Sequence, residues 1–72
     1  MGRYAIPLRS IRRVMEKAGA KRISDEALVE MEMQIEEYVM NITKAALSLL
    51  ASTGKSTLKP EHLRVVRYIM GK

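Results

Sequence analysis

A chain of 72 residues with a formal charge of +5 is enough for one domain and too few for two. Cysteine is absent and His62 is the single histidine, so disulfides and thiolate metal sites are excluded and no cofactor is expected. A chain this short rarely buries enough apolar surface to offset the entropy of ordering its residues. We therefore expect a second chain to complete the core.

The charges divide the sequence into three parts. Residues 1–22 carry seven basic side chains and one acid, residues 23–37 carry six acids and no base, and residues 38–72 carry six bases and one acid. We expect the acidic part to form a solvated helix face, turned away from a polyanion that the two basic ends contact. No secretory signal or bilayer-spanning apolar run is recognisable, so we expect a cytoplasmic protein without a membrane partner.

The first predicted helix follows a short segment, residues 1–5, that we expect to be flexible; the folded domain is expected over residues 6–72. Pro7 favours the first helical position, and Gly19 supplies a C-terminal stop. Between them, the apolar side chains at helical spacing are Leu8, Ile11, Val14 and Met15. This pattern predicts a short amphipathic helix.

A much longer helix is predicted to begin after Ser24, whose hydroxyl can cap it, and to continue until Gly54. Its apolar positions alternate in steps of three and four: Leu28, Met31, Ile35, Tyr38, Ile42, Ala45 and Leu49. At 1.5 Å per residue such a helix is about 40 to 45 Å long, too long for two short helices to cover. We therefore expect a dimer interface made by Leu28, Met31, Ile35, Tyr38, Ile42 and Leu49.

The last predicted helix begins near Pro60 and ends at Gly71. It is expected to bury Leu63, Val66 and either Ile69 or Met70. The fold class is therefore all-α, with a short helix, a long central helix and a second short helix.

Two strings in this sequence resemble the archaeal histones, and through them the histone fold of the eukaryotic core histones. Residues 18–27, AGAKRISDEA, are similar to the first loop and the start of the long helix, and residues 54–61, GKSTLKPE, are similar to the second loop. The resemblance runs from about residue 6 to residue 70. It implies a head-to-tail dimer whose long helices cross near Tyr38, with the first loop of one subunit beside the second loop of the other.

The resemblance also implies a DNA-binding role for particular residues. Arg22 matches an arginine that enters the minor groove, held by a threonine at the place of Thr57 in the partner, and Arg13 matches a first-helix arginine. Arg9 and Arg12 make the same helix strongly basic, with Glu16 as the one nearby acid. Further candidates around the paired loops are Lys21, Lys55, Ser56 and Lys59.

The sequence departs from the family where archaeal histone dimers stack. A histidine and an aspartate that join neighbouring dimers are replaced here by Ser52 and His62, and a second-loop arginine is replaced by Lys55. We therefore expect dimers that stack weakly or not at all.

The leading hypothesis is a histone-type homodimer that binds, bends or compacts double-stranded DNA in the nucleoid with little sequence preference. An alternative is a histone-fold subunit that pairs with an unlike chain in a transcription-related complex. We expect no enzymatic activity and no small-molecule substrate, because no nucleophile–base set, phosphate loop or metal spacing is present in the sequence.

Overall fold

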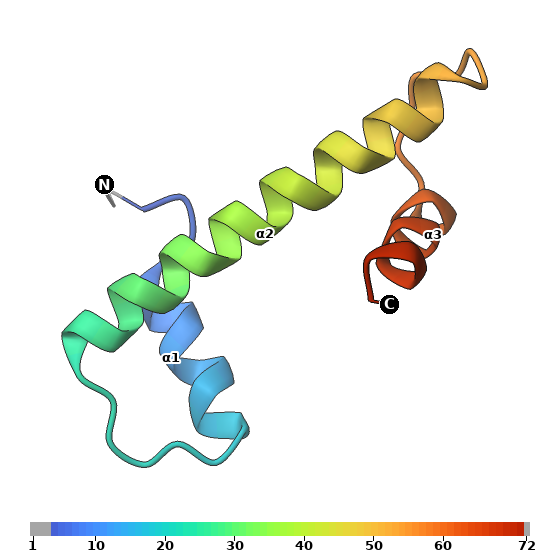
Figure 1. The fold of residues 1–72 in the computed structure, drawn as a ribbon. Helices are drawn as coiled ribbons and strands as arrows, with labels where there is room; N and C mark the ends of the chain where they lie inside the picture. The colour runs from blue at the N-terminus through green and yellow to red at the C-terminus, as the bar shows by residue number, and fades with distance from the viewer. Residues whose placement is uncertain (1–3, 72) are drawn as a thin grey trace. The chain divides into compact units, whose positions relative to one another are not determined.

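A computed structural model of the protein describes residues 4–71. Three helices follow one another along the chain: α1 (Leu8–Lys17), α2 (Asp25–Ala51) and α3 (Pro60–Met70). No strand occurs in residues 4–71, and the expected all-α order of short, long and short helix is confirmed (Figure 1). Residues 1–3 of the segment expected to be flexible, and Lys72, lie outside the described residues.

Helix α1 begins one residue later than the sequence predicted. Pro7 has an extended ψ of 132°, so it precedes the helix instead of occupying its first turn. Its carbonyl oxygen accepts the first hydrogen bonds, from the N–H groups of Ser10 (3.0 Å) and Ile11 (3.3 Å). After Lys17, the chain turns through Gly19, whose φ of 111° is one that residues with a Cβ rarely adopt.

Helix α2 begins where the sequence predicted, because the Ser24 hydroxyl oxygen accepts a hydrogen bond from the N–H of Ala27 at 3.1 Å. The helix ends three residues before Gly54. The hydroxyl groups of Ser52 and Thr53 donate to the carbonyl oxygens of Leu49 (2.7 Å) and Leu50 (2.8 Å) and so satisfy acceptors at the helix end. This local competition for the carbonyls explains the earlier stop.

Helix α3 begins at Pro60, as expected, and His62 caps it. The Nδ1 atom of the His62 ring accepts a hydrogen bond from the N–H of Lys59 at 3.0 Å. Since a side chain at the third helical position reaches back to the residue before the helix, His62 has the role that Glu or Gln has in a capping box.

The chain divides into two compact units, Met1–Glu37 and Tyr38–Lys72, and α2 contributes to both. In the first, called the N-terminal unit, α1 lies against the first half of α2 (Figure 1), and Ile11 and Leu28 are buried. In the second, called the C-terminal unit, α3 lies against the second half of α2, and Ile42, Ala46 and Val66 form the buried cluster.

Candidate nucleic-acid interface

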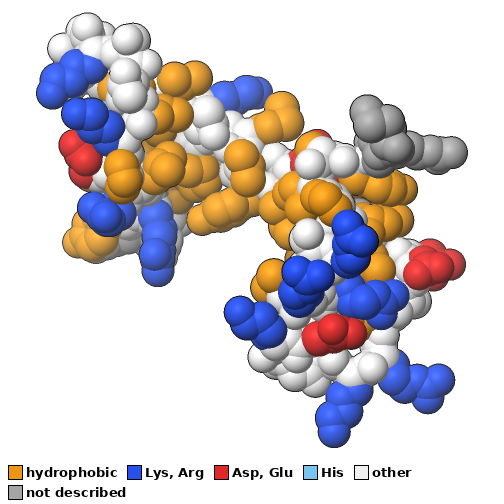
Figure 2. Space-filling model, turned by 180° about the vertical axis from the view of Figure 1, so that it is seen from behind, with side chains coloured by type: hydrophobic (Ala, Val, Ile, Leu, Met, Phe, Trp, Pro, Cys, Tyr) orange, Lys and Arg blue, Asp and Glu red, His pale blue; other side chains and the backbone are white. Residues whose placement is uncertain are grey.

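The basic residues of α1 lie opposite its apolar face. Arg9 and Arg13 are four positions apart and exposed, so they are neighbours on one side of the helix. Ile11 is buried on the other side. Lys and Arg side chains gather over α1 on the face seen in Figure 2. The first turn of α1 has no acid and no side-chain cap, so its N–H groups add to the positive potential there.

Arg12 differs from its two neighbours. Its guanidinium lies 3.8 Å from the Asp25 carboxylate, with 39% of the Arg12 side chain exposed and 93% of the Asp25 side chain exposed. The expectation that Glu16 is the one acid near these arginines was therefore wrong. The start of α2 comes close enough to α1 for Asp25 to compete with phosphate for Arg12. Such an exposed ion pair contributes little stability.

The loop candidates are exposed and belong to different units. Lys21 and Arg22 lie in the loop before α2, within the N-terminal unit. The second-loop candidates lie in the C-terminal unit: Lys55, Ser56, Thr57 and Lys59. A contact between Arg22 and Thr57 therefore remains a prediction about two subunits.

The acidic part of α2 is not a uniform solvated face, and that expectation is corrected at Glu32. Only 1% of this side chain is exposed. Its Oε2 atom accepts a hydrogen bond from the N–H of Ile6 at 3.4 Å, which ties the segment before α1 to α2. A hydrogen bond with the Glu36 side chain and burial raise the pKa of Glu32, and the Glu36 charge raises it further, whereas the N–H groups of Ile6 and Ala5 lower it.

The residues expected at a dimer interface fall into two groups. Leu28 and Ile42 are already buried by their own chain, at 4% and 8% exposure. Tyr38 is 58% exposed. The half-buried members are Met31, Ile35 and Leu49. Met31 and Ile35 line an apolar groove of about 370 Å³ in the N-terminal unit, together with Ile6, Ile11 and Val14. Large apolar side chains therefore remain open to a partner.

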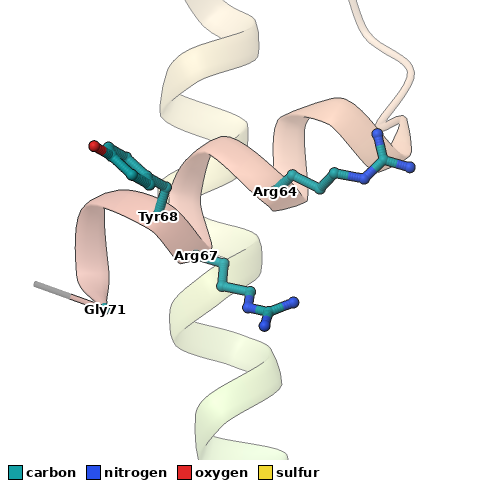
Figure 3. A pocket seen from close by; sticks show the side chains of 4 residues that line it. All are labelled: Arg64, Arg67, Tyr68 and Gly71. Atoms are coloured by element: carbon teal, nitrogen blue, oxygen red, sulfur yellow. The ribbon is translucent and has the colours of Figure 1, made fainter.

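A second basic surface lies on α3, where no candidate was expected. Arg64 and Arg67 leave α3 on the same side, and Tyr68 points in another direction (Figure 3). Both arginines also border a groove of about 340 Å³ whose other lining residues are Tyr38, Val39, Ile42, Thr43 and Leu63. This groove, called here the Arg-rimmed groove, lies wholly within the C-terminal unit.

Other kinds of site find no support in residues 4–71. No three His, Cys, Asp or Glu side chains of this part of the chain are grouped so as to hold a metal ion. In the same range, no helix has the length and apolar character needed to cross a membrane.

Together, the three helices with a long central one and the basic residues of α1 and the loops define a histone-fold subunit. The family of histone-like transcription factors (CBF/NF-Y) and archaeal histones matches residues 4–66. A similar protein is the archaeal histone HAN1 of Thermococcus zilligii, 33% identical over 60 residues that cover 83% of this chain and 90% of that protein. No solved structure matches significantly. The chain belongs to this histone-fold family, whose members package DNA or act as histone-like transcription factors.

Sequence reasoning missed three groups whose signals were present. Glu32 lies four residues after Leu28 and three before Ile35, a spacing that places it beside the apolar stripe and not opposite it. His62 stands three residues after the residue that precedes α3, the capping-box spacing. Arg64 and Arg67, being three apart, share a side of α3.

Proposed function

We propose that the protein is an architectural DNA-binding protein that pairs with a second copy of itself and binds, bends or compacts double-stranded DNA. Membership of the histone-fold family is the observation that carries this proposal. The basic residues of α1 and of the two loops then contact the phosphate backbone, Arg22 enters the minor groove, and base pairs are not read individually. Its place of action would be the nucleoid.

The area that the chain exposes supports the dimer. A compact protein of this mass exposes about 4,500 Å², because accessible surface scales with mass to the power 0.73. The described protein exposes 6,156 Å². The excess is comparable to what each partner of an obligate dimer buries. A subunit that stayed alone would leave its apolar grooves in water.

A titration of the pure protein with a short duplex at several salt concentrations tests the proposal. If a dimer neutralises roughly six to ten phosphates, the logarithm of affinity should fall with the logarithm of salt at a slope of about −5 to −9. Energy transfer between dyes at the duplex ends should rise on binding if the duplex bends. Affinity that is insensitive to salt, or strong selection of one sequence from a random pool, would contradict the proposal.

The family also includes histone-like transcription factors, so an unlike histone-fold partner is the alternative. The exposed arginines of α1 favour direct contact with DNA over a purely protein-binding role. Sedimentation of the pure chain separates the two: a self-associated dimer supports the first, and a lone monomer at micromolar concentration supports the second.

Assembly beyond the dimer is expected to be weak. Ser52 and His62, at the positions where stacking dimers have an ion pair, are both used within the chain, as hydroxyl donor to Leu49 and as cap of α3. Nuclease digestion of the complex should give one short protected length that does not change as protein is added. A ladder that lengthens in dimer-sized steps would contradict this prediction.

A further inference from the structure

The Arg-rimmed groove combines an apolar floor with two cations. Tyr38, Val39 and Leu63 line it and are 58%, 50% and 40% exposed. Arg64 and Arg67 stand at its edge and are exposed. A DNA phosphate would satisfy the arginines but would leave the apolar floor in water. An occupant that fits both features is a helix with an apolar stripe and a carboxylate beside it.

The chain carries such a helix in its own N-terminal unit. The first half of α2 presents the half-buried Met31 and Ile35, and every charged residue between positions 23 and 37 is an acid. Among these acids, Glu30 is held in place, because the Gln34 side-chain amide donates a hydrogen bond to its Oε2 atom at 3.0 Å. Gln34 directly precedes Ile35, so this bond draws the Glu30 carboxylate toward the edge of the apolar stripe.

We propose that the Arg-rimmed groove receives the first half of α2 from a second copy of this chain, and that Arg64 and Arg67 bind the Glu30 carboxylate of that copy. This inference rests on the proposed dimer and adds the residues that make the partner a second copy. If the two α2 helices cross near Tyr38, Ile42 of one copy faces the partner at about the position of Gln34 and Ile35, which brings Glu30 within reach of the arginines.

The charge arrangement explains why a like chain is chosen. Each copy offers one Arg-rimmed groove and one acidic helix half, so the same complementary contact forms twice in a two-fold dimer. An unlike histone-fold chain without a carboxylate at this place would leave two desolvated arginines without an anion, which disfavours the mixed pair.

Charge reversal with a swap tests the contact. Arg67→Glu and Glu30→Lys are made separately, and the dimer dissociation constant of each is measured by sedimentation equilibrium. Each variant alone should dissociate at least about tenfold more readily than the wild type, because two like charges then face each other. An equimolar mixture should form the mixed dimer in preference to either self-dimer, as native mass spectrometry can resolve by mass.

Matched controls use the same changes of charge on other faces. Glu26→Lys lies on the side of α2 opposite the apolar stripe, and Lys44→Glu lies on that same back face in the C-terminal unit. Both should leave the dissociation constant within about twofold of wild type. If the controls weaken the dimer as much as the test variants, the specific contact is overturned.

Two further outcomes separate this inference from the proposed function. If Arg64→Ala and Arg67→Ala keep the dimer constant unchanged but lower the affinity for a short duplex, the arginines contact DNA and the inference is wrong while the DNA-binding dimer stands. If the wild-type chain stays monomeric at all concentrations, both the dimer and the inference fail.

Discussion

The two units of the chain differ in the kind of surface that they leave exposed. Among the described residues, the exposed large hydrophobic side chains of the N-terminal unit are Val14 and Met33. The C-terminal unit exposes many more: Tyr38, Val39, Met40, Leu47, Leu58, Leu63, Val65, Tyr68, Ile69 and Met70. Conversely, the N-terminal unit holds the cluster of three arginines on α1 and the buried carboxyl group of Glu32.

This difference indicates a division of work between the units. An exposed apolar surface of this extent is a binding surface for protein, because water is a poor neighbour for it. Exposed arginines opposite a buried apolar face suit phosphate. Changes in the C-terminal unit should therefore affect pairing and folding first, and changes in the N-terminal unit should affect DNA binding first.

The largest effect is expected for Tyr38→Asp. Because Tyr38 is 58% exposed in the single chain, its replacement removes little packing within the chain itself. In the proposed dimer, two aspartates would be buried side by side at the helix crossing, at a cost of at least about 3 kcal/mol. The variant should be monomeric and largely unfolded, as light scattering and circular dichroism would report.

Met33→Asp is the control for this change. Met33 is also exposed, at 57%, but it lies on the opposite side of α2, so its replacement should change stability by no more than about 0.5 kcal/mol. Ile42→Asp is a less informative test, since Ile42 also belongs to the core of its own unit. A folded, dimeric Tyr38→Asp protein with an unchanged melting temperature would contradict the division of work.

The next largest effect is expected for Arg22→Ala, on DNA binding alone. A dimer loses two cations, so the salt slope should become less steep by about 2 and affinity at moderate salt should fall by roughly tenfold or more. The dimer constant should not change. Glu37→Ala, an exposed acid of the same unit, should bind DNA as well as wild type or better. Equal loss of affinity on every duplex tested is expected; loss on one sequence alone would count against backbone binding.

The helices were predictable from sequence because their signals are local. The hydroxyl of Ser24, the apolar periodicity of α2 and Pro60 each act on their own stretch of chain. The end of α2 was missed by three residues, since Ser52 and Thr53 compete for its last carbonyls through their hydroxyl groups. Such a competition is decided by side-chain geometry, which a periodicity does not contain.

The site was less predictable because its key contacts join distant positions. The Glu32 carboxylate meets the N–H of Ile6, 26 residues away, and the guanidinium of Arg12 meets Asp25 in the next helix. Charge counting treated both acids as solvated. It also left Arg64 and Arg67 unassigned, because their meaning depends on the apolar groove beside them. The exposure of the basic loop residues agrees with the prediction, but what they bind remains a prediction.

A smaller effect is expected for the α3 cap in the C-terminal unit. His62→Ala removes the acceptor for the Lys59 N–H and should lower the free energy of unfolding by about 1 kcal/mol per subunit, visible as a lower urea midpoint. His62→Gln keeps an acceptor at the capping-box position and should recover most of the loss. An unchanged midpoint for His62→Ala, or equal loss for His62→Gln, would show that the cap contributes nothing.

The smallest effect is expected for Glu32→Gln in the N-terminal unit, and it appears as a change in pH dependence. The pKa of Glu32 is raised in the folded protein above its ordinary value near 4.5, chiefly by the hydrogen bond with Glu36 and by burial, so the folded state holds this proton more tightly than the unfolded state. The stability from this proton is fully present below pH 4.5 and is lost as the pH rises through the folded-state pKa of the coupled pair.

Glutamine keeps an oxygen that can accept the Ile6 N–H and an amide that can donate to Glu36, but it does not titrate. The variant should therefore be at least as stable as wild type at neutral pH, and its unfolding free energy should fall less between pH 4.5 and pH 7. Urea denaturation at a series of pH values measures this slope, with Glu26→Gln as an exposed control that keeps the wild-type slope. Identical slopes for wild type and Glu32→Gln would mean that the buried carboxyl group keeps its ordinary pKa, and the N-terminal unit would then be held together by apolar contacts alone.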